Sequence, residues 1–390
     1  MTPMPLAAHH HEERLFYLLL ALGGAVVLAG LFAAHSMEAQ GHVITGMNNQ
    51  VVWGLPHVFA IFMIVAASGV LNVASVGSVF GQAMYKPLAP LSALLCLTLL
   101  AGGLMVLMLD LGRPERVIVA ATHYNFKSVF AWNVILYSGM AAIVLVYLGT
   151  MFERRFNRHT PAVGVAALVW RFVLTTGTGS IFGFLVARQA YQSALLAPMF
   201  IVLSLAWGLA LFLLVQSALL AWHGRLLDNA VRQRLARLLG IFVAASLYLV
   251  AVYHMTNLYL ARQGAFEAFI LRDGGLYPLL FWAGYVLLGS ALPLALLFHP
   301  RFAHERMTLT ASLLVLLGAF AWLYVFIIGG QAFPLDIFPG YQVSSSFGDG
   351  AVAHYRPSWP ELLLGLGGIA AAFVMTTVGV RVLDVLPREH

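Results

Sequence analysis

A few polar side chains interrupt otherwise apolar stretches of the sequence, close to one end of each stretch. His57 follows Pro56 near the start of an apolar run, Asp110 closes the next run, and Trp132 and Asn133 open the one after it. An ionisable or amide side chain inside a bilayer costs about 2–3 kcal/mol or more, so it needs an internal partner or a function. These residues are therefore the first candidates for a binding site.

A second group of polar side chains lies further along the sequence, toward the same predicted side of the membrane. His254 and Asn257 are three residues apart and so share one helix face. Arg188 and Arg262 end apolar runs, and Glu361 opens the last one. One leaflet therefore holds nearly all the titratable groups.

A bent helix end that carries an imidazole suits a small carbonyl ligand such as a quinone. A quinone needs an apolar slot and one or two hydrogen-bond donors, and its reduction takes two protons, which requires a group that titrates near neutrality, as histidine does. Pro56 removes a backbone donor and can open the helix beside His57. We predict that His57 donates to a quinone oxygen, that Asp110 relays protons, and that Arg113 sets the charge of Asp110. The further predicted cofactor contacts are Trp132, Asn133, His254 and Asn257.

Two other classes of function compete with a quinone site. His57 and His254 lie about 9 and 12 Å below their helix ends and could together bracket one b-type haem. A transporter is the alternative suggested by the prolines Pro56, Pro198 and Pro293, because broken helices can bind substrates at mid-membrane. His9, His10 and His11 form a short metal-like run, but near the cytoplasmic N-terminus it is expected to be inert, so no metal site is expected.

Arg171 is the one charged residue toward the middle of a predicted span, and no acidic residue sits at its depth. It either contributes to a proton or water path from the cytoplasm or extends its guanidinium to the inner interface. Both interpretations stay open at this point.

The elements that must position these residues are membrane-spanning helices. Of 390 residues 61% are hydrophobic and 9% charged, whereas soluble domains carry roughly a quarter charged residues. A bilayer core needs about 20 apolar residues per helix, and we predict an all-α polytopic protein with ten such spans. Their predicted limits are 15–35, 51–80, 88–111, 126–151, 163–188, 194–223, 238–262, 277–298, 307–330 and 359–383.

The sequence indicates one integral membrane domain with both termini in the cytoplasm. Thirteen Lys and Arg fall on the side of residues 1–14 and the C-terminus, against seven on the other side, and positive loops stay inside. This excess on one side explains the net charge of +6 without nucleic acid. The loop 331–358, rich in Pro, Gly, Ser and aromatic residues, is predicted to be a periplasmic cap or docking segment.

The single cysteine, Cys96, limits the redox chemistry that this protein can hold. One thiol allows no internal disulfide, no CxxCH haem attachment and no cysteine-ligated iron–sulfur cluster. A redox centre must then be bound by other ligands or by a partner.

Residues 105–134, MVLMLDLGRPERVIVAATHYNFKSVFAWNV, resemble the NrfD/PsrC family of quinone-interacting membrane subunits, with LDLGRPER as the most specific segment. The second span and the last outer loop, PLDIFPGYQVSSSFGDGAVAHYRPSWPELLLGLGG, resemble the DsrP branch of that family, with HybB-like subunits next. The likeness covers the second to fourth and the last two predicted spans well.

The resemblance implies a fold of two four-helix bundles, flanked by the first and last spans. It implies a quinone, menaquinone or ubiquinone, near the outer face, and no haem or iron–sulfur cluster in this protein. The implied partners are a periplasmic ferredoxin-like [4Fe-4S] subunit of the DsrO kind and further DsrM-, DsrK- and DsrJ-like subunits. His57 matches the family's quinone-contacting histidine, and Asp110 with Arg113 matches its acidic and basic pair. The implied activity is electron transfer in a respiratory or sulfur-metabolism complex.

Overall fold

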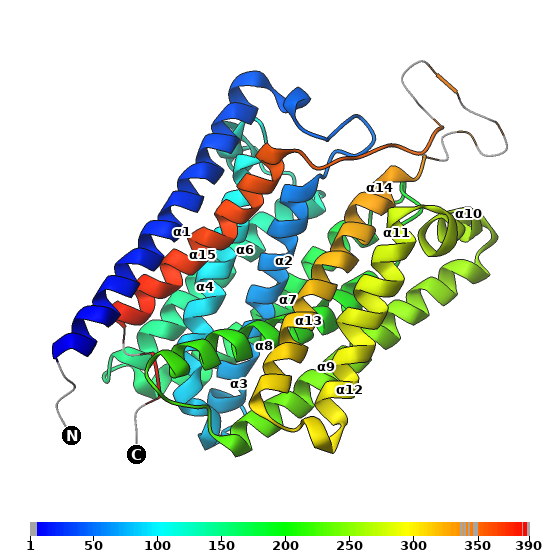
Figure 1. The fold of residues 1–390 in the computed structure, drawn as a ribbon. Coiled ribbons are helices and arrows are strands. Elements are labelled where there is room, and N and C mark those ends of the chain that lie inside the picture. Colours follow the sequence, from blue (N-terminus) through cyan, green and yellow to red (C-terminus); the bar gives the residue numbers. More distant parts are fainter. Residues whose placement is uncertain are drawn as a thin grey trace.

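The protein is a bundle of long helices that run roughly parallel or antiparallel to one another (Figure 1). The computed structural model describes residues 6–335, 338, 341, 344–345, 350–383 and 385–387, without the side chains of residues 6–12 and 120. These residues contain ten helices that are long and apolar enough to cross a membrane, and no strand. The prediction of an all-α polytopic membrane protein is confirmed. Part of the predicted loop 331–358 lies outside the described residues.

Ten spans follow one another along the sequence, and some of them consist of more than one helical segment. They are α1 (Leu6–Gln40), α2 (Leu55–Val70) with α3 (Asn72–Ser78), α4 (Ala89–Leu109), α6 (Val129–Phe152), α7 (Thr160–Gly183), α8 (Leu196–Trp222), α9 (Asn229–Tyr259), α11 (Leu276–Leu279) with a π-helical segment (Leu280–Ala291) and α12 (Leu292–Phe298), α13 (Glu305–Leu323) with a second π-helical segment (Tyr324–Gly329) and α14 (Gly330–Ala332), and α15 (Trp359–Val382).

Two of the prolines that were expected to interrupt helices lie instead in the first turn of a helix. Pro56 lies in the first turn of α2, which starts four residues later than predicted, and Pro198 lies in the first turn of α8. A helix leaves its first backbone N–H groups without internal partners, so a proline there removes no hydrogen bond. The prediction that Pro56 opens a helix beside His57 is therefore wrong, and His57 is a first-turn residue.

The helices form two bundles of four, with α8 at their junction. In the first bundle α2 packs on α4 and α7, and α6 packs on α4 and α7; in the second, α8 and α13 pack with α9 and α12. Helix α8 also packs along α2, where Gly69 and Gly208 face each other. A Cβ atom at Gly208 would overlap the backbone of α2. This close approach holds the two bundles together.

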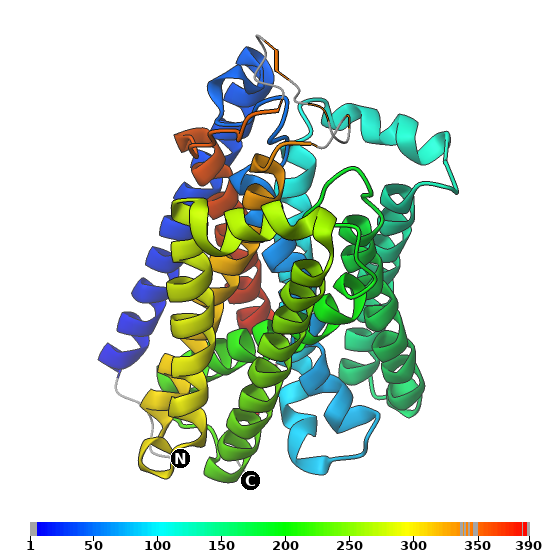
Figure 2. The same cartoon turned by 90° about the vertical axis from the view of Figure 1, so that its right-hand side faces the viewer.

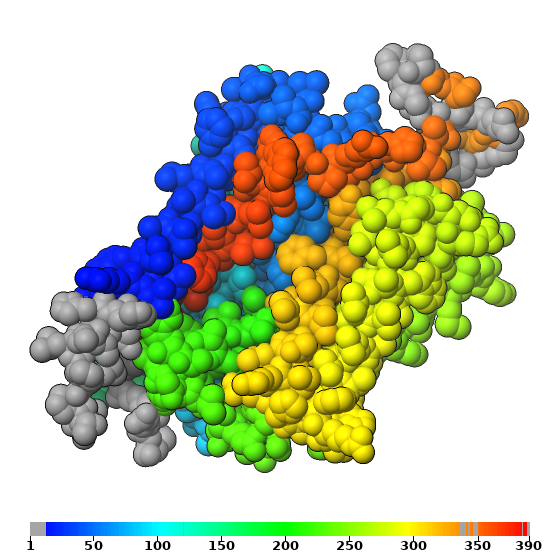
Figure 3. Space-filling model, viewed as in Figure 1, coloured from blue at the N-terminus to red at the C-terminus, as the bar shows by residue number. Residues whose placement is uncertain are grey.

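The first and last helices lie side by side against the first bundle (Figures 1 and 3). Gly30 of α1 and Gly367 of α15 sit at their contact, where a Cβ atom on Gly30 would lie 2.9 Å from the Cα atom of Gly367. Helix α15 in turn contacts α4 and α2, whereas α1 is largely exposed. The two flanking helices thus form a pair on one side of the protein.

We call the face at which α1 begins and α15 ends the basic face, after its predicted excess of Lys and Arg, and the other end of the bundle the opposite face. At the opposite face two short helices run across the bundle, α5 (Val117–Thr122) and α10 (Gly264–Ala268) (Figure 2). Helix α10 covers the end of the second bundle. The candidate site residues lie beneath this face.

Candidate functional site

The imidazole of His57 and the carboxylate of Asp110 meet beneath the opposite face. His57 lies in the first turn of α2, and Asp110 is the C-cap of α4. The distance from His57 Nδ1 to Asp110 Oδ2 is 2.9 Å, and the Asp110 side chain is 1% exposed. The two groups are within ion-pair distance but not aligned as a hydrogen bond, and among the described residues neither Asp110 oxygen has an aligned donor. The pair is therefore open to a further polar partner.

A second histidine, His42, approaches Asp110 from the loop after α1. Its Nε2 atom lies 3.0 Å from the Asp110 backbone carbonyl oxygen and 3.9 Å from Oδ1. Among the described residues, the basic side chains within 4 Å of the Asp110 carboxylate are therefore imidazoles.

The ring of His57 stacks on the indole of Trp53, with ring centroids 5.9 Å apart and an interplanar angle of 25°. Trp53 in turn contacts Phe130, Phe182 and Tyr191. Phe130 is about half exposed, whereas Phe182 and Tyr191 are buried. The histidine thus sits beside flat apolar surfaces that extend toward the outside of the bundle through Phe130.

The segment before α2, residues 50–54, has no regular secondary structure, and side chains from distant parts of the sequence supply its hydrogen bonds. The Oε1 atom of Gln331, in α14, accepts from the backbone N–H groups of Val52 and Trp53, both at 3.0 Å. Its Nε2 group donates to the carbonyl oxygens of Trp53, at 3.0 Å, and Ile327, at 2.8 Å. One buried amide therefore fixes the backbone of the residue that stacks on His57.

Arg188 adds a second anchor to the same segment. It donates to the carbonyl oxygens of Gln50, at 2.6 Å, and Gln331, at 2.8 Å. Burial lowers the pKa of its guanidinium, and the nearby Tyr191 acts against this shift. The two carbonyl acceptors satisfy a partly buried cation, so Arg188 joins the start of α2 to the end of the second bundle.

Glu361 is fully buried in the first turn of α15 and completes the set of anchors. Its carboxylate accepts from the backbone N–H groups of Gly46, at 2.9 Å, and Ser358, at 2.8 Å, and from the hydroxyl of Tyr355, at 2.5 Å. The Tyr355 oxygen accepts from the backbone N–H of Leu55, at 2.7 Å. Burial and the adjacent Glu361 raise the pKa of Tyr355, so its hydroxyl remains a donor. The predicted Glu361 acts here as a structural link.

Several residues predicted for the first site lie elsewhere. Arg113 is exposed, and among the described residues no salt bridge joins it to Asp110, so the predicted pair of Asp110 and Arg113 is wrong. Trp132 is about half exposed and donates to the carbonyl oxygen of Phe126. Asn133 is buried and donates to a carbonyl of its own helix and to one of α7. Of this predicted group, the structure brings His57 and Asp110 together and leaves the others apart.

His254 and Asn257 converge on Glu267, a residue that the sequence analysis did not single out. His254 Nδ1 lies 2.7 Å from Glu267 Oε2, and the Asn257 amide donates to Oε1 at 2.8 Å. Glu267 is fully buried in α10, which folds back over the end of α9. This is a second histidine–carboxylate pair beneath the opposite face, in the second bundle.

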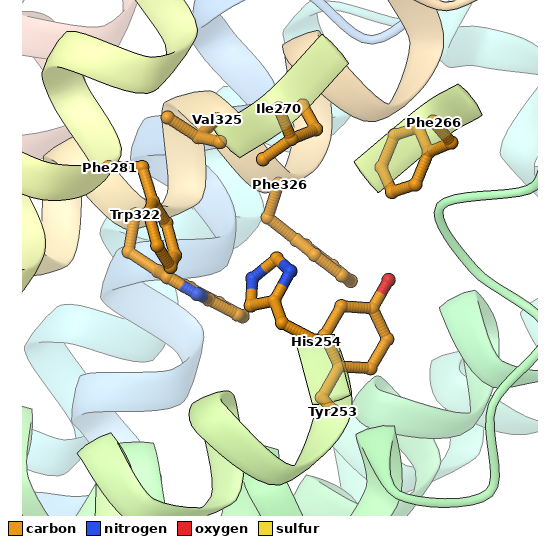
Figure 4. A pocket seen from close by; sticks show the side chains of 8 residues that line it. All are labelled: Tyr253, His254, Phe266, Ile270, Phe281, Trp322, Val325 and Phe326. Atoms are coloured by element: carbon orange, nitrogen blue, oxygen red, sulfur yellow. The ribbon is translucent and has the colours of Figure 1, made fainter. Parts of the chain in front are cut away.

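A narrow aromatic pocket adjoins His254 (Figure 4). The imidazole lies among the rings of Trp322, Phe326 and Phe281, with Tyr253 beside it. The pocket holds about 280 Å³ of space between atoms, its mouth included. Trp322 and Phe326 come from the end of α13 and the π-helical segment that continues it, and such wider turns often occur at functional sites.

The two histidines belong to separate sites. A series of ring contacts leads from Trp53 to Tyr191, with centroids 6.4 Å apart, and from Tyr191 to Phe326, at 5.3 Å. Phe326 also lines the pocket of His254. These side chains occupy the region in which a haem bracketed by His57 and His254 would have to lie, so the packing argues against that alternative.

Arg171 is buried in the middle of α7, and its guanidinium does not reach the basic face. It donates to the carbonyl oxygen of Ser68, at 3.1 Å, and lies over the ring of Phe172. Its Nε atom has no partner among the described residues. The interpretation of a side chain extended to the inner interface is therefore wrong. A role in a proton path stays a prediction.

Comparison with known proteins identifies the family of this protein. The family description "Polysulphide reductase, NrfD" matches residues 43–335, which includes both histidine–carboxylate pairs. The chain belongs to the NrfD family. The membership predicted from the LDLGRPER segment is thereby confirmed.

Relatives in the NrfD family match most of this protein. The Hdr-like menaquinol oxidoreductase integral membrane subunit of Archaeoglobus fulgidus is 28% identical over 89% of this chain and 88% of its own length. The menaquinone reductase integral membrane subunit of Nitratidesulfovibrio vulgaris is 21% identical over 92% and 89%. The polysulfide reductase C subunit of Wolinella succinogenes is 25% identical over 73% and 96%. These are membrane subunits of multi-subunit redox complexes.

Sequence reasoning on this NrfD-family protein missed the residues that hold the site in place. Trp53, Gln331 and Tyr355 lie outside the predicted polar set, as does Glu267, which falls between two predicted spans. Glu267 carried a usable signal, since it is an acidic residue within the apolar segment AFEAFI. Gln331 and Tyr355 carried none, because their importance comes from backbone groups about 280 and 300 residues earlier in the sequence.

Proposed function

We propose that the protein is a quinone-interacting electron-transfer subunit whose quinone binds at His57 and Asp110. The observation that carries this proposal is the His57–Asp110 pair, in which the buried carboxylate has no aligned donor among the described residues. The His57 ring stacks on Trp53, which in turn contacts the half-exposed ring of Phe130. A quinone head group needs a polar donor at its oxygen and a flat apolar wall for its ring, and these residues supply both. The names of the menaquinol oxidoreductase and menaquinone reductase relatives agree with this proposal.

Each side chain has a separate role in such a site. A bound quinone supplies a carrier of two electrons and two protons. His57 presents Nδ1 to Asp110, which leaves Nε2 for a ligand oxygen. Asp110 Oδ2 lies 2.9 Å from that Nδ1 atom and can exchange a proton with the imidazole. Trp53 shields one face of the imidazole from water, which strengthens a hydrogen bond made by the other ring nitrogen.

We further propose that electrons pass between this site and a ferredoxin-like [4Fe-4S] subunit docked on the opposite face. The site lies directly under that face, and the excess of Lys and Arg at the other end of the bundle favours a periplasmic position for it. A DsrP-like place in a sulfur-metabolism complex, with DsrO-, DsrM-, DsrK- and DsrJ-like partners in a bacterial inner membrane, is the assignment that the last outer loop supports. The quinone that co-purifies with the isolated complex would distinguish menaquinone from ubiquinone.

The test replaces His57 in the assembled complex. His57→Ala should reduce quinol-linked turnover by about 10²- to 10⁴-fold, the range for loss of a general acid–base group, with normal subunit composition. His35→Ala is the matched control, because His35 is exposed near the end of α1 on the same face. Normal turnover in the His57 variant would remove His57 from the mechanism. Isolation of the complex without any iron–sulfur subunit would overturn the proposed partner.

A further inference from the structure

A polar cavity lies at the basic face, far from both histidine–carboxylate pairs. It is bounded by the start of α9, the end of α12, the turn Pro300–Phe302 and the start of α13, and it has about 710 Å³ of unfilled space, its mouth included. Its polar lining consists of Arg232, Gln233, Arg237, His299 and Thr308. Its apolar lining includes Ala236, Leu296, Leu297, Phe298 and Phe302.

The cavity carries positive charge that no carboxylate among its lining residues balances. Arg232 is 7% exposed and donates to Thr308 Oγ1, at 3.2 Å, to the carbonyl oxygen of Ala303, at 3.1 Å, and to the side-chain oxygen of Asn229. All three acceptors are neutral. Arg237 lies further along α9 and is exposed at the cavity. Burying a guanidinium without a counter-charge is costly, so the cavity favours an anion.

The nearest acidic residue in the sequence is already engaged. Asp228 caps α9, and its carboxylate accepts from the backbone N–H groups of Ala230 and Val231, both at 3.0 Å. No Asp or Glu is among the described residues that line the cavity. The balancing anion must therefore come from another molecule.

The apolar part of the cavity points to the kind of anion. Phe298 packs directly on α9, where a Cβ atom at Gly240 would lie 2.7 Å from its ring. Phe298 and Phe302 are partly exposed. The cavity thus combines a cationic part at the end of two membrane-spanning helices with an apolar part along them. That is the level at which phospholipid headgroups meet acyl chains.

We propose that this cavity binds an anionic phospholipid, with its phosphate on Arg232 and Arg237 and an acyl chain along Leu296 and Phe298. Free phosphate shares the headgroup chemistry but would leave the apolar wall uncovered. A bound lipid seals the gap between α9 and α12 and neutralises Arg232. The site is independent of the proposed quinone chemistry.

The experiment measures lipid retention by native mass spectrometry of the detergent-purified full-length protein. Phosphatidylglycerol should be retained over phosphatidylcholine, and Arg237→Gln should weaken its binding about fivefold, the effect of one interfacial cation. Arg234→Gln is the control, because Arg234 is exposed on the same helix but does not line the cavity. It should bind phosphatidylglycerol as the wild type does.

A second measurement separates the sources of phosphate and does not depend on any variant folding. Phosphatidylglycerol should raise the thermal unfolding midpoint of the wild-type protein, whereas millimolar inorganic phosphate should leave it unchanged. Equal stabilisation by inorganic phosphate would overturn the lipid assignment. Equal retention of the two phospholipids would contradict the proposed lipid site. An equal loss of phosphatidylglycerol binding in the Arg237 and Arg234 variants would contradict it as well.

Discussion

The amide of Gln331 is the strongest single constraint on the backbone next to His57, and replacing it by alanine tests how the site is positioned. Gln331→Ala removes four hydrogen bonds, two to Trp53, one to Val52 and one to Ile327. Val52 is about half exposed, so water can replace its lost partner. The N–H and carbonyl groups of Trp53, a partly buried residue, have no partner other than Gln331 among the described residues.

The magnitude follows from these two orphaned groups. A buried polar group that loses its partner costs about 1–3 kcal/mol, and water that enters the space left by the side chain recovers part of it, so we expect the segment 50–54 to be destabilised by about 2–4 kcal/mol. At 1.4 kcal/mol per factor of ten, amide hydrogen exchange in this segment should accelerate roughly 30- to 700-fold. Quinol-linked turnover should fall with it, because Trp53 no longer holds His57.

The assay is hydrogen–deuterium exchange with peptides that cover residues 50–56, in the detergent-purified protein. Gln40→Ala serves as the control, because Gln40 is exposed at the end of α1 on the same face. The reasoning is refuted if Gln331→Ala exchanges at the wild-type rate in this segment. Faster exchange with unchanged turnover would instead show that the position of Trp53 does not affect the chemistry at His57.

Three further perturbations test other parts of the structure. Gly208→Ala should destabilise the protein by about 1–3 kcal/mol or more through overlap with the backbone of α2, whereas Gly149→Ala, with open space around it, should not lower the thermal unfolding midpoint. Arg113→Gln should leave the pH profile of quinol turnover unchanged, because its side chain is exposed; a shifted profile would contradict this placement. The pKa of Tyr355 is raised by burial and by Glu361, so its contribution to stability is complete below its ordinary pKa of 10.0 and declines by about 1.4 kcal/mol per pH unit above it. The stability advantage of the wild type over Tyr355→Phe, measured by thermal unfolding from pH 7 to 11, should therefore shrink above pH 10, and a constant difference would count against the raised pKa.

The sequence by itself determined the class of protein, the number of spans and the family. Apolar stretches of about 20 residues can satisfy their backbone groups in a bilayer only as helices, so composition and length were sufficient for the fold class. The cost of polar groups in that setting also identified His57, Asp110, His254 and Asn257 without any alignment. His57 and Asp110 form one histidine–carboxylate pair, and His254 and Glu267 form the other, to which Asn257 donates a hydrogen bond.

Only the tertiary structure decided which of these groups meet. Asp110 and Arg113 are three residues apart, but α4 ends at Leu109 and Gly112 turns the backbone with φ +70°, so Arg113 leaves the bundle while Asp110 faces α2. Glu267 joins His254 only because α10 folds back over α9. Local sequence records the type of each side chain, but contacts across hundreds of residues depend on how the helices pack, and that packing sets the geometry of the proposed site.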